Sequence, residues 1–590
     1  MKKITVSQKV TFVCVATLIV GFAGFFTTDV FPASCDAGVH LRCARDFFFA
    51  IADQFSYPDW DPYPAGGRGA LSFRFTGPLP YALAAFFQLL GFSVPMAVKL
   101  VVLTFALAAL WGIHRWVSVL HLPSSSFLWA SVFFLSGPIL TFSIWYVFLF
   151  QNVCALLLFP ICLAGLSEAS IGNRRGILIA AIAYGMICWT HPQSAMMVGY
   201  ASVAWAFCEW ATERTWKSFS TPIRNIVLMG TFGILSASPY LLPALTSTHD
   251  AHFELENDFL PGVTTKFLDD PFLDASGKPR TAGNALQELV ALLRNRVIET
   301  IPTLGWTPDA THPLPRPGSL YPFETIRPWL ALSAISLLLP ALVGFFLFPK
   351  GKALSYGIPG LIAIFLTTRW SEVIWTHFPG SWSFQFVWRW LLPAQVLLIP
   401  LIFQIGSPET ARWKRGIAFC SFVPLLLCTL SLQFLGGTFS AERMENVIRI
   451  ASSSTMFLPA GCPVSQISPH SSGEFHSLSI QGEKNSVELL GKGFAWVRFR
   501  ASVATATANL FINTHFDRLW RLTRQDHAVL PHPSIPIQRV ASDGTMEISL
   551  PAGTAEYLLD RESPPLRFLG WFLMAGCLAL GCWLCRRRLS

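Results

Sequence analysis

The chain has 590 residues, of which 52% are hydrophobic and only 13% are charged, and it contains 50 Phe and 21 Trp. This composition is too apolar for a soluble protein of that length. The net charge of +9 comes without a basic run interleaved with aromatic residues, so it indicates basic cytoplasmic turns more than a nucleic-acid surface.

About 13 apolar segments reach or approach the roughly 18–20 residues that a bilayer span needs. One of them, 78–92, is short and begins with prolines, which predicts a re-entrant or interfacial helix and leaves about 12 crossings. The first segment is long and Asp36 lies directly beyond it, so we favour an uncleaved helix over a signal peptide. The clearest spans are 10–30, 95–113, 147–166, 177–191, 194–211, 225–245, 329–348, 390–405, 416–435 and 567–585.

Basic residues predict the orientation of these spans. Lys2 and Lys3 place the N-terminus in the cytoplasm, and the run 586–588 of three arginines places the C-terminus there. The regions expected outside are 32–80, 246–326, 370–387 and 437–565.

The region before the last span changes character. It carries strand and turn signals such as MEISL (546–550) followed by Pro-Ala-Gly. We expect three parts: a transmembrane domain over 1–436, an extracytoplasmic β-rich domain over 437–565 that folds as a small β-sandwich, and a final helix with a basic tail over 566–590.

The thirteen cysteines do not form an evident disulfide framework, because most lie in apolar spans, where Cys behaves as a small hydrophobe. Cys35 and Cys43 lie outside the spans. On one straight helix they would be about 12 Å apart, too far to bridge without a bend. The sequence has no Cys/His zinc spacing.

The segment after the first span holds the most informative polar residues. Asp36 and His40 are four residues apart and can share one helix face. At a membrane surface, such a pair can carry out acid–base or metal chemistry. Arg42, Trp60 and Asp61 follow, and then a Gly-rich turn and a Gly-Pro-Leu-Pro-Tyr step into the next apolar run.

This arrangement resembles the first extracytoplasmic loop of the GT-C superfamily of membrane glycosyltransferases, and within it the bacterial membrane proteins labelled 6-pyruvoyl-tetrahydropterin synthase-related and the YfhO-type family. That label implies no pterin chemistry. Three other segments also resemble this family: Thr-His-Pro at 190–192, QFVWRW at 385–390 and DGTMEISLPAGTAEYLLD at 543–560. The helix at 146–160 departs from the family pattern, because the expected Arg and Glu are missing and Gln151, Asn152 and Cys154 stand in that stretch instead.

The resemblance implies a polytopic α-helical GT-C-like fold of about 12–13 membrane helices in the bacterial cytoplasmic (inner) membrane. It also implies transfer of a sugar from a polyprenyl-phosphate-linked donor to a glycan, lipid or protein acceptor of the cell envelope, with membrane lipid as a partner and no nucleic acid. This displacement needs a base for the acceptor hydroxyl and cations for the departing phosphate. The catalytic candidates are Asp36 and His40, which are also the possible ligands of a divalent metal ion. The substrate-binding candidates are Arg42, Trp60, Asp61, His191, Gln385, Trp388 and Arg389, and Arg45, Arg68 and Arg74 are further cations of the same loop.

Each candidate also has a purely structural interpretation. Asp36 suits a helix N-cap, Asp61 suits a turn, and Arg389 suits an anchor in an interfacial aromatic belt. His40 could be a solvated loop residue and His191 a satisfied buried one. Two other function classes remain open: a polysaccharide or lipid transporter or flippase, although the two related halves with broken helices typical of transporters are not evident, and a non-catalytic envelope assembly protein, which the missing Arg and Glu keep open.

Overall fold

The computed structural model describes residues 36–54, 57–213, 215–248, 323–347, 352–368, 387–403, 412–435, 476–525, 534–540 and 544–586, with Phe25, Phe31–Pro32, Ser34 and short pieces at 251–252, 371, 374–375, 405, 438–439 and 458–459. Most of the predicted loop 246–326, the candidate Gln385 and Cys35 lie outside the described residues.

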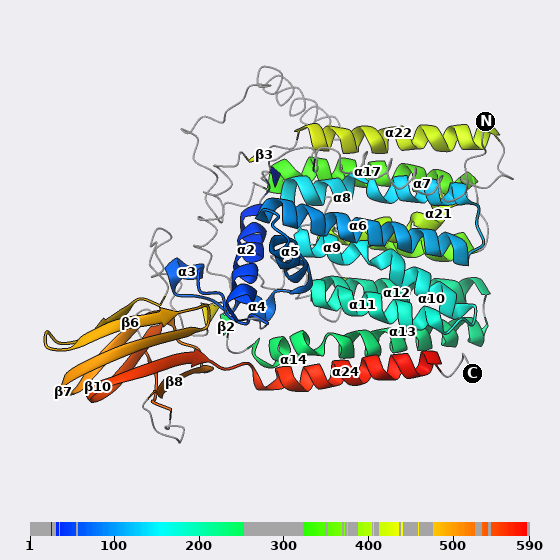
Figure 1. Cartoon of the computed structure of the whole chain (residues 1–590). Helices are drawn as coiled ribbons and strands as arrows, with labels where there is room; N and C mark the ends of the chain where they lie inside the picture. Colours follow the sequence, from blue (N-terminus) through cyan, green and yellow to red (C-terminus); the bar gives the residue numbers. More distant parts are fainter. Residues whose placement is uncertain are drawn as a thin grey trace, which may run out of the picture.

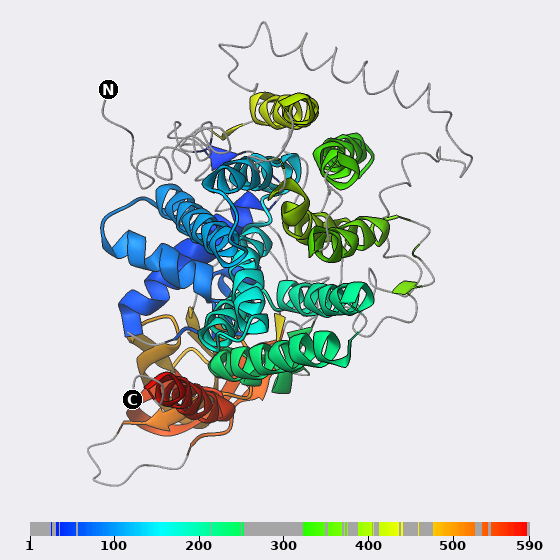
Figure 2. The same cartoon turned by 90° about the vertical axis from the view of Figure 1, so that its right-hand side faces the viewer.

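Long apolar helices run side by side and form the body of the molecule (Figure 1), and Figure 2 shows them nearly end-on. Four described helices are long and apolar enough to cross a membrane, or five if one bent pair counts as a single span. Five further apolar helices are shorter. The predicted polytopic α-helical membrane fold is confirmed, whereas the count of about 12 crossings stays a prediction.

The helices from α6 to α14 follow one another with short connections. Two of them, α13 and α14, form the bent pair, with an angle of 79° between them. The bounds are α6 Val94–Val119, α7 Ser124–Leu135, α8 Pro138–Phe142, α9 Phe150–Leu157, α10 Phe159–Ser170, α11 Arg175–Thr190, α12 Pro192–Glu213, α13 Trp216–Ser236, α14 Ser238–Thr246, α17 Phe323–Leu347, α18 Lys352–Phe365, the 3₁₀ turn η7 Val387–Trp390, α20 Leu391–Leu397, α21 Ile399–Phe403, α22 Arg412–Leu435 and α24 Pro565–Arg586.

The helix that follows α7 is interrupted, and the interruption shapes the candidate site. After α8, Ser143–Val147 form a π-helical turn, and Phe148 adopts a left-handed conformation with φ of 58°. Such conformations are rare for a bulky residue and frequently occur at functional sites. The turn leaves the carbonyl of Val147 to accept the backbone N–H of Asp36 at 3.0 Å. The irregular backbone therefore fixes the start of the first loop.

The first loop lies across the ends of the long helices. Its main helix, α2 (Ala37–Gln54), runs roughly perpendicular to them in Figure 1, and α3 (Pro64–Gly67) and α4 (Ser72–Phe75) follow. The next helix, α5 (Leu79–Leu89), has 11 residues, or about 16 Å, which is too short for a bilayer. This length agrees with the predicted re-entrant or interfacial segment. Cys43 on α2 is buried and forms no disulfide.

The β-rich part before the last helix is also confirmed, and its strands form one antiparallel sheet in the order β5-β7-β10-β8, with β6 added to β7 and β9 to β10. It extends beyond the helix ends (Figure 1). The strands are β5 Leu478–Ile480, β6 Ser486–Lys492, β7 Trp496–His515, β8 Trp520–Arg524, β9 Gln538–Arg539 and β10 Thr545–Arg561; the two-residue strands β1 Phe31–Pro32, β2 Ala251–His252, β3 Thr438–Phe439 and β4 Leu458–Pro459 lie outside this sheet.

The predicted β-sandwich would have two separate sheets. Here the long strands β7 and β10 run from one half of the domain into the other, so that both halves belong to one sheet. Buried side chains of β7 have odd numbers from Val497 to Val503 and even numbers from Ala508 to Ile512. A register shift opposite Pro551 and Gly553 accounts for the change, since a bulge reverses the face that side chains take. Both halves contribute to one hydrophobic cluster.

Candidate active site

Asp36 lies in the turn that leads into α2, and its carboxylate is half-buried. Burial raises the pKa of this carboxyl to about 6, and the nearby charge of Arg389 partly opposes that rise. No side-chain hydrogen bond to this carboxylate is present among the described residues, whereas a capping carboxylate accepts one from the first helical turn. Asp36 is therefore a carboxylate of raised basicity that is not used as a cap in the described structure.

His40 lies one turn further along α2, and its Nδ1 is 2.7 Å from the hydroxyl oxygen of Tyr81. The ring also makes edge contacts with Phe148 and Phe150. Burial lowers the pKa of His40 to about 3, and the charges of Arg389 and Arg42 lower it in the same direction. His40 is thus a neutral, packed side chain rather than a solvated loop residue.

His191 joins two helices of the body. It ends α11 and precedes α12 with extended backbone angles, φ −159° and ψ 100°, and Pro192 occupies the first helical position. Its Nδ1 accepts the backbone N–H of Ser194 at 3.1 Å, which is the hydrogen bond of a helix N-cap. His191 therefore has a definite structural role, and its ring stays close enough to Arg389 for the guanidinium charge to act on it.

Arg389 lies in the 3₁₀ turn η7, close to Asp36, His40 and His191. Its side chain is only 9% exposed, and Nη1 donates to the amide oxygen of Gln193 at 3.4 Å. Trp388 and Trp390 are also buried, with Trp388 against Phe142. An anchor in an interfacial belt would be exposed to headgroups, so the burial of this side chain and its contact with α12 favour a role inside the protein.

The structure thus brings together four of the predicted residues from three separate parts of the chain. Asp36 and His40 come from the first loop, His191 from the α11–α12 junction, and Arg389 from the start of a late helix. The charge of Arg389 acts on each of the other three. A carboxylate, a guanidinium and two neutral imidazoles in one half-buried place can bind an anion and accept a proton.

Two polar residues beside this group were missed as candidates in the sequence. Asn152 donates from Nδ2 to Ser194 Oγ at 2.8 Å. Gln151 donates to the carbonyls of Gly77 at 2.8 Å and Thr190 at 3.2 Å. Both stand in the stretch where the family pattern has an Arg and a Glu, and polar residues inside an apolar span are usually functional. The presence of two polar side chains in an apolar span is therefore the signal in the sequence that points to Gln151 and Asn152.

The remaining candidates of the first loop lie elsewhere. Arg42 faces Asp46 at 3.8 Å and Asp61 at 3.7 Å, all three side chains being buried. Burial raises the pKa of Asp61 to about 7, and the like charge of Asp46 adds to the rise while Arg42 opposes it. Asp61 also accepts the backbone N–H of Tyr63. This is the turn interpretation of Asp61, combined with a buried ion pair.

Trp60 packs against the sheet instead of the Asp36 group. Its ring lies 5.6 Å from that of Trp520, and the Arg561 guanidinium lies 5.4 Å from its centroid. The indole is 1% exposed, so an open sugar-stacking surface is not present at this residue. Trp60 instead joins the first loop to the sheet.

The divalent metal ion considered for Asp36 and His40 stays a prediction. No group of three or more His, Cys, Asp or Glu side chains in the described residues is arranged to hold a metal ion. The charge of Arg389 beside both residues also disfavours a dication. We assign no step of the mechanism to a metal ion.

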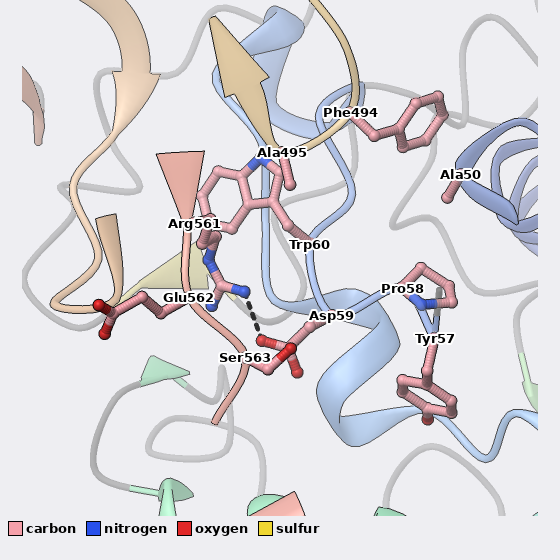
Figure 3. Close-up of a pocket in the computed structure, with 10 residues that line it drawn as sticks. All are labelled: Ala50, Tyr57, Pro58, Asp59, Trp60, Phe494, Ala495, Arg561, Glu562 and Ser563. Atoms are coloured by element: carbon pink, nitrogen blue, oxygen red, sulfur yellow. Dashed lines mark hydrogen bonds and ion pairs between the residues drawn. The ribbon is translucent and has the colours of Figure 1, made fainter. Parts of the chain in front are cut away.

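A second group of charges fastens the first loop to the sheet and to the last helix. Asp59 pairs with Arg74 at 2.8 Å, with Arg567 at 2.7 Å and with Arg561, and Asp517 pairs with Arg74 at 3.4 Å and with Arg561. Figure 3 shows Arg561 directed at Asp59. Burial alone would raise the pKa of Asp59, but the three guanidiniums hold it well below its usual range.

An apolar groove opens at the far end of α2. Its volume is about 410 Å³. From Asp36 to Phe47, the nearest groove residue on α2, the distance along the helix is about 16 Å. On α24, Phe568 and Phe572 are 72% and 76% exposed, which places the groove beside a lipid-facing surface. The lining residues are Phe47, Ile51, Tyr57, Pro58, Pro78, Leu79, Ala82, Met186, Trp189 and Trp571.

These features define a polytopic membrane protein with a buried polar group at the ends of its helices and a sheet domain before the last helix. Residues 73–272 match the model of a family described as "6-pyruvoyl-tetrahydropterin synthase related domain; membrane protein", which confirms the resemblance drawn from the sequence. The matched residues include Tyr81, Asn152 and His191 but neither Asp36 nor Arg389. A search of curated proteins gives no significant match.

Several solved structures are similar in part. The arabinofuranosyltransferase AftD from Mycobacteria is 15% identical, with 73% of this chain and 27% of that chain covered and a TM-score of 0.43. The oligosaccharyltransferase of Archaeoglobus fulgidus is 10% identical, with 75% and 57% covered and a TM-score of 0.41. ArnT from Cupriavidus metallidurans bound to undecaprenyl phosphate is 10% identical, with 85% and 99% covered and a TM-score of 0.32. The chain thus spans about a quarter of AftD and just over half of the oligosaccharyltransferase.

Proposed function

We propose that this chain is an integral-membrane glycosyltransferase that moves a sugar from a polyprenyl-phosphate-linked donor to a glycan, lipid or protein acceptor of the cell envelope. The reaction takes place on the extracytoplasmic side of the bacterial inner membrane, and both termini are cytoplasmic. The observation that carries the proposal is the meeting of Asp36 with Arg389 and two neutral histidines at the helix ends.

Each residue of the group has a part in the proposed displacement. Asp36 takes the proton of the acceptor hydroxyl while that oxygen attacks the anomeric carbon. The bond between this carbon and the phosphate oxygen breaks, and the phosphate leaves with both electrons. Arg389 offers the departing phosphate a planar pair of N–H donors. The proton stays on Asp36 until solvent removes it.

The transporter alternative has one observation in its favour, the 79° bend between α13 and α14. Purified protein in detergent separates the two functions, since detergent abolishes the two leaflets that flipping requires. Release of free polyprenyl phosphate from polyprenyl-phosphate monosaccharides in the presence of an acceptor extract supports transfer. Complete absence of release across the donor panel, with folded protein, contradicts it.

Arg389→Lys is expected to weaken donor use although the charge is retained, and Arg389→Ala to weaken it more. Lysine cannot place two parallel N–H groups on phosphate oxygens. Loss of a charged hydrogen bond typically costs about 1.5–3 kcal/mol, or roughly ten- to a hundredfold in affinity. The measurement is the KM for the donor in the release assay. A Lys variant with the wild-type KM would make Arg389 a structural residue.

The apolar groove suits the isoprenoid tail of the same donor, because its lining is almost entirely apolar and it lies beside the exposed Phe568 and Phe572 of α24. Ala82→Phe places a ring in the groove and is expected to raise the KM for a long-chain donor about tenfold, since displacing two buried CH₂ groups costs about 1.6 kcal/mol. The KM for a ten-carbon analogue should not change. Leu107→Phe, on a 48% exposed position of α6, is the matched control. Equal effects on both donors would exclude the groove as the tail site.

A further inference from the structure

The hydrogen bonds of His191 determine which ring nitrogen carries its proton. The backbone N–H of Ser194 can only donate, and it lies 3.1 Å from Nδ1. Nδ1 must therefore be an acceptor, which excludes both the Nδ1–H form and the doubly protonated imidazolium. A neutral imidazole has a single N–H, so the proton is on Nε2.

A second contact is consistent with the tautomer that the backbone N–H fixes. Ser194 Oγ lies 2.8 Å from Nδ1, and it accepts the Nδ2–H of Asn152 at 2.8 Å. The serine oxygen accepts this N–H with one of its two lone pairs, and its own proton can point at the Nδ1 lone pair. Asn152 and Ser194 are both buried. The three side chains form a short relay that ends at Nε2–H.

We propose that His191 is a neutral hydrogen-bond donor to the phosphate of the lipid-linked donor, held in its Nε2–H form by Ser194 and positioned through Asn152. This inference rests on the proposed function. The charge environment supports an anionic partner, because the Arg389 guanidinium donates to Gln193, two residues from His191, and its cation acts on the His191 ring. Donors that converge with a cation are complementary to phosphate oxygens.

The assignment also limits what His191 can do. With its proton on Nε2 and its Nδ1 lone pair used by Ser194, the ring has no lone pair for a substrate proton or a metal ion. This leaves Asp36 as the base of the group. It also gives the unusual Asn152 a role in place of the Arg and Glu of the family pattern: it is a positioning residue that acts through Ser194.

His191→Asn separates the structural role from the proposed one. Asparagine is among the best N-cap residues, so the bond to the Ser194 N–H and the melting temperature in detergent should be retained. The shorter side chain cannot reach where Nε2 does. Tryptophan fluorescence titrations with undecaprenyl phosphate should then show binding about tenfold or more weaker than in the wild type. Binding of phosphate-free undecaprenol should stay unchanged.

The outcomes are distinguishable. If the wild type prefers undecaprenyl phosphate over undecaprenol and His191→Asn keeps that preference, His191 is only a cap and this inference is wrong. If the wild type shows no preference, the proposed donor class itself fails. A ¹⁵N-histidine spectrum, with the His191 signal identified by its loss in His191→Asn, should show neutral Nε2–H, and an Nδ1–H or imidazolium signal would overturn the assignment. Asn152→Leu should shift that signal, which a purely packing role would leave in place.

Discussion

Asp36→Asn is expected to lower sugar transfer by about a hundred- to ten-thousandfold, while binding of polyprenyl phosphate stays near the wild-type value. The amide keeps the shape of the carboxylate but cannot accept the proton of the acceptor hydroxyl, and positioned bases typically contribute 10²–10⁴-fold. The measurement is donor turnover together with undecaprenyl phosphate binding. Asp53→Asn, the same change at the other end of α2, is the matched control.

The pH dependence of sugar transfer follows from the carboxylate of Asp36. Burial raises the pKa of Asp36 to about 6, so the base is protonated and inactive below that pH and ionised above it. The value of kcat/KM should therefore rise as pH increases through about 6 and then level off.

Near wild-type turnover in Asp36→Asn would refute the assignment of Asp36 as the base. Loss of folding in that variant, with Asp53→Asn intact, would instead support the capping interpretation.

The sequence predicts the residues of the candidate site, but it does not predict that they lie close together in the fold. Asp36 and His40 are visible as a four-residue spacing beyond a span, and His191 and Arg389 as charged or titratable residues at span ends. Their convergence depends on the π-helical turn at 143–147, which holds the Asp36 backbone through Val147. No local pattern predicts that turn, because its geometry depends on packing between helices.

The polar relay behind His191 shows a second limit of the sequence. In the sequence, Asn152 stands out only as a departure from a family pattern, since the side chain it contacts, Ser194, belongs to another helix. The sheet shows the same limit: alternation in β7 and β10 predicts strands, but a bulge changes the buried face. Spacing within one element can be read from the sequence, whereas partners in other elements cannot.

The charge group around Asp59 joins segments about five hundred residues apart, and breaking it is expected to have the largest effect on stability. Asp59→Asn removes the shared counterion of Arg74, Arg561 and Arg567 and leaves Asp517 as the one carboxylate in the described group. Removal of one partner from a buried ion pair typically costs about 3–5 kcal/mol. Because the pKa of Asp59 is held well below its usual range, this stabilisation should persist at all pH values above about 4.

A compensating change makes this prediction specific. Three arginines and two aspartates give the group a net charge of +1, which Asp59→Asn raises to +2. Adding Arg567→Met returns it to +1, so the double variant should recover part of the lost stability if the effect is electrostatic. The measurement is thermal unfolding in detergent, with limited proteolysis of the sheet domain as a local probe. Since Asp59 lies on the loop that also carries Asp36, a loosened sheet should lower turnover as well. A double variant no more stable than Asp59→Asn would mean that packing around Trp60, rather than charge, joins the sheet to the loop.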